Sequence, residues 1–566
     1  MESEDAIPKT AKRAAGEEAS SAGRLRDRSI NGSNLPFRHS WTPEISSNMR
    51  SARREEFLAK RRTGSFDQLS SNNALRCVRR RSSSSKEPLH HACDLSPVGD
   101  ASSRIALLTT RLRSTSFAMA FAAVSEIRKL TAAEDSEQVD MLVSFGVPRP
   151  LIEMLSESAT GLRFEAAWAL SNIAAGTPQQ TLAVVAEGAL KPLIALLDHI
   201  NKDLVAMALW AIGNIVADNG HFRDLALENG LLPRLLPLIV VADEGEKDVL
   251  HNVSWLLVNM CRTKNPPPST KLIATLADKL RLLLHCRDEK IRIDGVWCLA
   301  YLSDSTADMI DILLDDVGVL DLLANLPTAA RNNVSFLLGG VRTIGNLLSG
   351  SDAQCDAVIA AGFVPLLVQL LGHPHVTIQK ETLSCLANVS AGSSAQIQAI
   401  LSNAGLLSQI VSFVGKDNSA LQEEALWIIA NIAQGGSLAQ ITDVLETEPL
   451  KPLCRLLHSR NIHLVKLTLE TILRLLKRCP SDFFKTLRNF IETCGGLRKT
   501  ELLLLNDDDL TYELCYEIID LCSRENNEER EPAVILPDLA VLDFDIPHLS
   551  SALDFSQQLD RPQAAS

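Results

Sequence analysis

The feature that most constrains this chain is a tryptophan followed four residues later by an asparagine inside an apolar stretch, as in ALWAIGNI. Four residues advance an α-helix by ~6 Å and about one turn, so the indole and the amide lie on one helix face. A single pair of this kind would be core packing beside a stray polar residue. The complete pairs are Trp168/Asn172, Trp210/Asn214, Trp255/Asn259 and Trp427/Asn431. Their recurrence calls for a common structural reason.

Three partial copies extend the pattern. They are Trp297/Tyr301, Arg342/Asn346 and Ser384/Asn388, and successive copies lie 42 to 45 residues apart. A sustained period in the low forties is typical of helical solenoids of the armadillo or HEAT kind. Each unit reads as a short apolar helix, a glycine break, a second helix and then the helix with the pair, and three helices favour the armadillo kind. We therefore expect an all-α fold, a right-handed armadillo-repeat superhelical solenoid of about ten repeats.

The composition changes outside the repeats, which are expected over residues 101–525. Residues 1–100 are basic and mostly rich in Ser, Asn, Arg, Pro and Gly, which predicts disorder. Within them MRSARREEFLAKRR could form one charged helix. Residues 526–566 are acidic and interrupted by prolines, and are predicted to be a loosely held tail. A basic tail on a chain of net charge −13 invites self-association.

Cysteine usage and hydropathy indicate the compartment. The twelve cysteines form no CxxC pair, and most lie in apolar helical runs, as expected for reduced thiols of an intracellular protein. No apolar run reaches the ~18 residues that cross a bilayer, and the N-terminus lacks the apolar core of a secretory signal. We expect a location in the cytoplasm or nucleus and no membrane partner.

The repeated pairs predict a binding face. Equivalent helices of a solenoid pack ~8 to 10 Å apart, so the indoles and amides form two parallel ladders. An asparagine amide offers a donor and an acceptor to the backbone of an extended peptide. Slots between indoles suit the stem of a lysine, with ~0.5 to 2 kcal/mol of cation–π attraction. Acids close to the ladders, which could meet the ammonium ends, are Asp218, Asp304, Glu381 and Glu424. The predicted ligand is an extended peptide rich in Lys and Arg.

Several motifs carry a family resemblance. NIAAGTPQQT, ALWAIGNIVADN, VSWLLVNMCRTKNPPP and GVWCLAYLSDS resemble the armadillo repeats of importin alpha, the adaptor for lysine-rich nuclear localisation signals, over roughly residues 100 to 525. The resemblance implies an import adaptor without a cofactor that links cargo to importin beta and shuttles between cytoplasm and nucleus. LLLLNDDDLTYELCYEIIDLCSRE is similar to the family's last repeat, which implies docking of an export receptor of the CAS type with Ran-GTP.

The resemblance also implies two peptide sites. The residues implied for the major site are Trp168, Asn172, Gly176, Thr181, Trp210, Asn214, Asp218, Trp255 and Asn259. Asp218 would bind the key lysine, helped by the Gly176 carbonyl and the Thr181 hydroxyl. The residues implied for the minor site are Trp297, Tyr301, Asp304, Arg342, Asn346, Glu381, Asn388, Glu424, Trp427 and Asn431. Ser384 stands where the family usually has an indole, so one wall of a minor-site slot would be missing.

The N-terminus matches the family only in part. Members begin with a long basic domain that binds importin beta and, when unbound, folds back over the signal groove. The segment near 48–82 resembles the last part of that domain. Lys60, Arg61 and Arg62 are therefore the predicted autoinhibitory signal mimic, with the cluster Arg79 to Arg81 as a rival.

Other functions fit the sequence less well. It has no HExxH, GxSxG or GxxxxGK[ST] motif, so we expect no enzyme. His90, His91 and Cys93 lack a second ligand pair, which argues against a metal site. The RCVRRRSSSSK stretch suggests nucleic-acid binding, but it contains no aromatic residue and the body of the chain is acidic. The alternative is another armadillo-repeat scaffold or interaction protein that binds extended basic peptides. A catenin-like scaffold would bind acidic partners through a basic groove, whereas the acids and the Trp/Asn pairs here favour a basic ligand.

Overall fold

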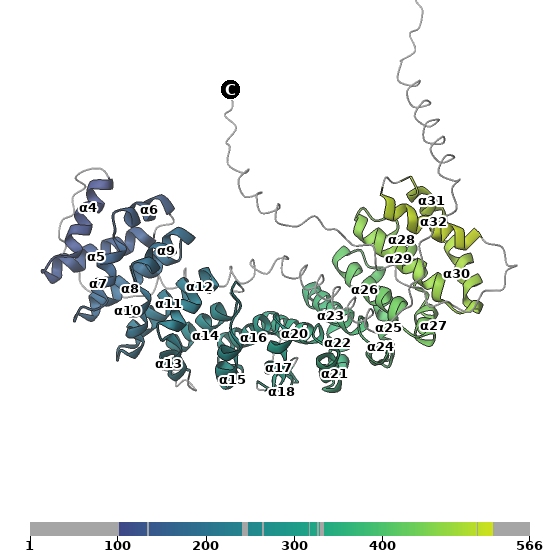
Figure 1. Cartoon of the computed structure of the whole chain (residues 1–566), viewed down its shortest axis with the longest axis horizontal. Helices are drawn as coiled ribbons and strands as arrows, with labels where there is room; N and C mark the ends of the chain where they lie inside the picture. The colour runs from purple at the N-terminus through teal and green to yellow at the C-terminus, as the bar shows by residue number, and fades with distance from the viewer. Residues whose placement is uncertain are drawn as a thin grey trace, which may run out of the picture. The chain divides into compact units, whose positions relative to one another are not determined.

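The structure is a computed structural model. It describes residues 101–523 apart from 133–134, 240–246, 263–264, 316, 325, 327, 329–332 and 506–507. These residues belong to one compact unit, 54–528, while the second unit, 1–53 and 529–566, lies outside the described residues. All regular elements in the described ranges are helices, and they follow one another in chain order from α4 to α32 (Figure 1). The predicted all-α armadillo-repeat fold is confirmed.

A repeat consists of three helices, as the glycine break predicts. In one repeat α9 (Pro178–Ala186) turns into α10 (Leu190–Ala195), which η1 (Leu196–Asp198) extends before α11 (Lys202–Asp218) begins. Gly188 lies at the first corner with φ of 85°, a left-handed conformation that glycine adopts without the strain of a Cβ. The sharp corner lets two short helices pack on the longer third one.

The third helices stack along the chain. Ten lie within the described residues: α5 (Phe117–Ala132), α8 (Thr160–Ala174), α11, α14 (Lys247–Arg262), α16 (Glu289–Ser303), α20 (Val334–Leu348), α23 (Val376–Ser390), α26 (Ser419–Gly435), α29 (Ile462–Arg478) and α32 (Asp509–Ser523). Each packs against the next one in this order. Because both flanks are covered by neighbours, these helices are apolar on most of their surface.

The first and second helices complete the repeats. They are α4 (Ala101–Leu112), α6 (Ser136–Ser144), α7 (Pro148–Met154), α12 (Gly220–Glu228), α13 (Leu231–Leu235) with η2 (Leu236–Leu238), α15 (Thr270–Leu284), α17 (Ala307–Asp315), α18 (Val319–Leu323), α21 (Asp352–Ala360), α22 (Phe363–Leu371), α24 (Ser394–Leu401), α25 (Leu406–Val414), α27 (Leu438–Glu446), α28 (Leu450–Leu456), α30 (Ser481–Thr493) and α31 (Gly496–Leu503). The expectation that every unit reads alike is wrong at α15, a continuous helix in place of two. Its sequence TKLIATLADKLRLLL contains no glycine to break it.

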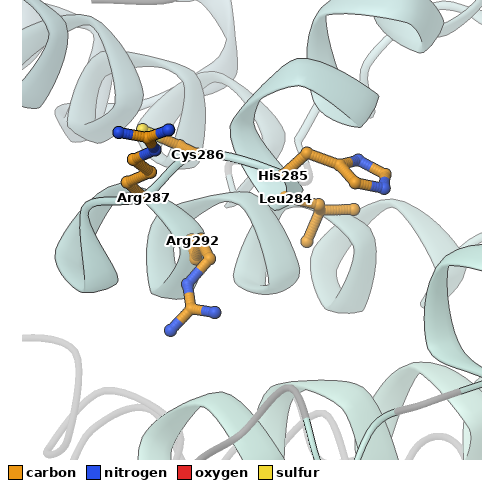
Figure 2. Close-up of a pocket in the computed structure, with 5 residues that line it drawn as sticks. All are labelled: Leu284, His285, Cys286, Arg287 and Arg292. Carbon is orange, nitrogen blue, oxygen red and sulfur yellow. The ribbon is translucent and has the colours of Figure 1, made fainter.

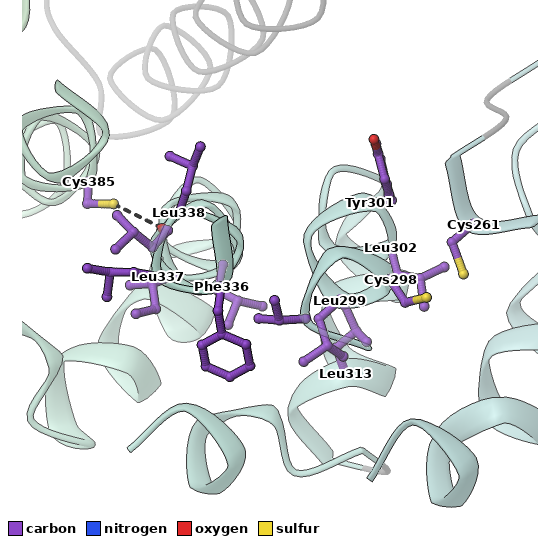
Figure 3. Close-up of a cluster of buried hydrophobic side chains, with 14 of the residues drawn as sticks. Cys261, Cys298, Leu299, Tyr301, Leu302, Leu313, Phe336, Leu337, Leu338 and Cys385 are labelled. Carbon is purple, nitrogen blue, oxygen red and sulfur yellow. Dashed lines mark hydrogen bonds between the residues drawn. The ribbon is translucent and has the colours of Figure 1, made fainter. Parts of the chain in front are cut away.

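The core between the third helices is mostly aliphatic. Figure 3 shows Leu299 and Leu302 of α16 with Leu313 of α17 and Phe336 of α20, all buried. The cysteines among the described residues are free thiols, and most of them are buried. No single helix in the described ranges is long and apolar enough to cross a membrane, although three bent helix pairs pass that test by length and composition.

A glutamine ladder joins neighbouring repeats at the N-termini of their first helices. Gln396 illustrates it: its Oε1 accepts from the Ser393 backbone N–H at 3.0 Å, closing a capping box on α24. Its Nε2 donates to the Asp352 carbonyl and to Asp356 Oδ1 in the preceding repeat, at 3.1 and 2.7 Å. The same capping box is built on Gln180, Gln354 and Gln440. One side chain thus caps its own helix and holds the previous one.

Gly392→Ala should loosen this joint. A Cβ at position 392 would lie 1.5 Å from Gln396 Oε1, so the glutamine must leave its capping position. Losing the cap and the bonds to the preceding repeat costs about 2 kcal/mol, which predicts roughly thirtyfold faster amide hydrogen exchange in α24. Gly372→Ala is the control, because its nearest neighbour is Gln369 O at 3.5 Å. Equal exchange in both variants would contradict the role of the ladder.

Candidate peptide-binding site

The tryptophans of the repeated pairs are partly exposed on helices that are otherwise mostly buried. Trp168, Trp210, Trp255, Trp297 and Trp427 are each partly accessible. The chain neighbours of Trp168, Ala167 and Ala169, are fully buried. An indole that is kept at the surface of a buried helix presents a large apolar face to a ligand.

The asparagine amides bind the preceding third helix. Each Nδ2 donates to a backbone carbonyl there: Asn172 to Arg128 at 3.3 Å, Asn214 to Ser171 at 2.9 Å, Asn259 to Gly213 at 3.5 Å, Asn346 to Ala300 at 3.0 Å, Asn388 to Gly345 at 2.8 Å and Asn431 to Ala387 at 3.1 Å. We call each indole position together with the amide position four residues later a rung of the ladder. The residue whose carbonyl accepts from that amide is the floor residue of the rung. These bonds hold successive third helices in one register.

Four of these amides make a second contact with the preceding helix. Their Nδ2 atoms also donate to a hydroxyl of the preceding helix, on Thr131, Ser171, Ser303 and Ser390. On three of these rungs the carbonyl and the hydroxyl lie within 3.2 Å of each other, so both acceptors face the same side of the amide nitrogen. The Oδ1 atom can accept from a peptide N–H group. That each amide offers both a donor and an acceptor to the ligand stays a prediction. The amides are suited to accept from peptide N–H groups.

The floor residue also supports the indole of its rung. The Trp255 ring lies directly on Gly213, where a Cβ would approach Trp255 Cζ3 to 2.2 Å. Gly345 is the corresponding floor below Ser384, and its carbonyl accepts from Asn388. That rung therefore keeps a glycine floor while the side chain above it is a serine.

Ser384→Trp should restore an indole on this floor. We expect a signal peptide with two basic clusters to bind about fivefold more tightly, because a lysine stem gains ~1 kcal/mol beside an aromatic ring. Isothermal titration calorimetry with two-cluster and single-cluster peptides would measure the change. Ser412→Trp, at an exposed serine of α25, is the control and should change neither affinity. A gain for both peptides or for neither would count against a second binding site.

The acid at the end of α11 is accessible. Asp218 is exposed, and its Oδ2 accepts from the Asn219 side-chain amide at 2.7 Å, which leaves its charge without a cation in the described residues. Thr181 is buried, and its hydroxyl donates to the Ala174 and Thr177 carbonyls at 3.1 and 3.2 Å. Gly176 is exposed at the corner before α9, which packs against α11. A ligand ammonium could be met here by carboxylate and carbonyl oxygens.

The acids further along the chain lie in different surroundings. Glu381 is almost buried, and its Oε1 lies 2.7 Å from Arg342 Nη2, so its charge is balanced within the protein. Asp304 follows the last turn of α16, and Glu424 lies three residues before Trp427 on α26. Among the four predicted acids Asp218 is the most exposed, so its negative charge is the most accessible to a ligand.

The rung of Trp297 is tied to its surroundings. The Trp297 indole N–H donates to Ser335 Oγ at 3.1 Å, and its ring lies 6.0 Å from that of Tyr301, which is buried. Asp294, one turn earlier, accepts from the Ser254 hydroxyl at 2.6 Å. Burial raises the pKa of Asp294 to about 6 although this hydrogen bond lowers it. Sequence reasoning missed Asp294. Its signal was its position three residues before Trp297, which corresponds to Glu424 before Trp427 and to Glu381 before Ser384.

A pocket away from the ladders does not form a convergent site. It lies at the corner of α15 and α16 and is lined by Leu284, His285, Cys286, Arg287 and Arg292 (Figure 2). The two arginines point to different sides of the ribbon (Figure 2), so they do not meet on one ligand. The predicted mimic Lys60 to Arg62, its rival at 79–81, and the HHAC stretch lie outside the described residues.

Comparison with known proteins points to one family. The Armadillo/beta-catenin-like repeat model matches residues 135–175, 177–217 and 351–391. The chain is similar to importin subunit alpha-1a of Oryza sativa subsp. japonica, with 35% identity over 435 residues that cover 75% of this chain and 81% of that protein. It is 49% identical to importin subunit alpha-3 of Caenorhabditis elegans over 201 residues, 36% of this chain and 39% of that protein.

Among solved structures, the crystal structure of an engineered protein shares the fold. It matches with a TM-score of 0.64 and 23% identity, and covers 74% of this chain and 99% of its own.

Proposed function

The chain belongs to the importin alpha family of nuclear import adaptors, and on this premise we propose that it binds nuclear localisation signals rich in Lys and Arg and links their cargo to importin beta. The signal binds along the face of the third helices that carries the tryptophans. The protein acts by binding and not as an enzyme. It shuttles between cytoplasm and nucleus and needs no cofactor.

The observation that carries this proposal is the set of five partly exposed indoles on buried helices, four of which are paired with an oriented amide. Lysine stems pack between indoles, where they exchange water for apolar surface and keep their ammonium groups accessible. The amide oxygens accept from peptide N–H groups, so the peptide must be extended. Asp218 supplies the carboxylate for one ammonium in the major site, Trp168 to Trp255.

Direct binding tests this function. A fluorescent single-cluster lysine peptide is titrated with the full chain and importin beta, and the same peptide with alanine in place of lysine is the control. We expect saturable binding of the lysine peptide that weakens as salt is raised. If both peptides bind with the same affinity, the protein does not recognise the basic side chains of the signal. Tighter binding of an acidic peptide would favour a catenin-like armadillo-repeat scaffold instead.

Two further partners follow from the same proposal. Importin beta binds the basic segment near 48–82 within the N-terminal region 1–100, and an export receptor of the CAS type with Ran-GTP docks on the last repeat, which contains α32. Cargo is then released for another cycle. The repeats occupy 101–525 and the acidic tail 526–566. Nucleic acid and membranes are not partners in this proposal.

A further inference from the structure

Arg128 makes three contacts with the first rung of the ladder. From α5, its guanidinium carbon lies 4.3 Å from the centroid of the Trp168 ring. Its Nε lies 2.6 Å from Glu165 Oε2, and both side chains are mostly buried. Its backbone carbonyl accepts from Asn172 Nδ2. One residue therefore contacts the indole, the amide and an acid of the same helix, α8.

The floor residues explain why this rung differs from the others. The other floor residues are small: Ser171, Gly213, Ala300, Gly345 and Ala387. Small floors leave the space beside an indole to a ligand. At the first rung the floor residue is Arg128, whose long cationic side chain covers one face of Trp168. A guanidinium over an indole is the arrangement that a ligand cation would adopt in the other slots.

The charge of this slot is also balanced from within. Glu165 would otherwise be an acid beside the first indole, ready to attract a ligand ammonium. Its ion pair with Arg128 removes that attraction, and displacing the arginine would leave a mostly buried carboxylate without a partner. Steric and electrostatic features thus act together at this rung.

We propose that Arg128 is a resident cation that closes the binding groove at Trp168 and so limits how many basic side chains a signal can place there. The inference rests on the proposed function and specifies its ligand. Basic side chains use the slots between Trp168, Trp210 and Trp255, whereas an additional basic residue beyond Trp168 finds its slot filled. Arg128 is a specificity residue for the length of the basic cluster.

The test compares peptide lengths in the full chain. Three fluorescent peptides are used: a single lysine cluster and two versions extended by an alanine and a lysine at one end or the other. The wild-type chain should bind all three within about twofold. Arg128→Ala should bind one extended peptide at least fivefold more tightly than the unextended one, because the vacated face of Trp168 and the carboxylate of Glu165 then accept the extra lysine. Arg128→Lys retains a cation and should behave as the wild type.

The matched control removes an ion pair of the same repeat away from the groove. Arg104 of α4 pairs with Glu126 of α5, and Arg104→Ala should bind the three peptides as the wild type does. The proposal is overturned if Arg128→Ala weakens all peptides equally, which would mean that Arg128 only positions Trp168. Unchanged binding in Arg128→Ala, or a length preference already present in the wild type, also overturns it. Failure of every peptide to bind the wild-type chain would instead refute the proposed function, and this inference with it.

Discussion

Asp218→Lys is expected to abolish binding of a single-cluster lysine peptide. The substitution places an ammonium where the exposed carboxylate at the end of α11 would meet the key lysine, so attraction becomes repulsion. Removing one partner of such a charge pair typically costs ~2 to 5 kcal/mol, so affinity should fall at least about thirtyfold. Titration calorimetry with the full chain would measure this loss.

The control for this substitution is Asp203→Lys. Asp203 is exposed in the first turn of the same helix, so the net charge changes equally while the acid near the Trp210 rung remains. We expect Asp203→Lys to retain most of the affinity. Equal losses in both variants would mean that the peptide responds to overall charge, and an unchanged affinity in Asp218→Lys would place the signal elsewhere.

The repeat period carried most of the fold prediction, because side chains at one helix face must recur wherever the same face is buried. The tryptophan and asparagine spacing identified the third helices, and the corner glycines identified the breaks before the second ones. The continuous helix α15 followed from a missing glycine that the average pattern concealed. The glutamine ladder corresponds to a recurring sequence pattern, G-[ST]-x-x-Q, as at Gly392 to Gln396. That these glutamines join two repeats can be seen only in the structure, where each side chain meets the preceding repeat.

The site was predictable as a set of residue types but not as a set of charges. The candidate acids predicted close to the ladders were Asp218, Asp304, Glu381 and Glu424. Ion pairing, however, depends on which side chains of adjacent helices approach each other. Glu381 is paired with Arg342 and Glu165 with Arg128, and both pairs join residues about one repeat apart. Such contacts require the register between helices, which the asparagine bonds to the floor residues set.

Alanine substitution of Lys60, Arg61 and Arg62 in the full chain is expected to strengthen signal binding. These residues lie outside the described residues, and the expectation rests on the resemblance of their segment to an autoinhibitory one. A flexible linker of the length that separates them from the first repeat reaches ~35 Å by random-coil scaling, enough to place the cluster over the major site. A tethered mimic competes at an effective concentration near ~1 mM, so one with a Kd of about 10 µM would weaken external binding roughly a hundredfold.

Peptide affinity of this triple variant should therefore approach that of residues 101–566 alone, and importin beta should raise the affinity of the wild-type chain but not of the variant. Alanine substitution of Arg79, Arg80 and Arg81 is the matched control, because it removes the same charge from the rival cluster. A gain only in this second variant would move the mimic to 79–81. Equal affinities in every chain, with and without importin beta, would rule out autoinhibition, since a segment that occupies the groove must compete with any ligand that binds there.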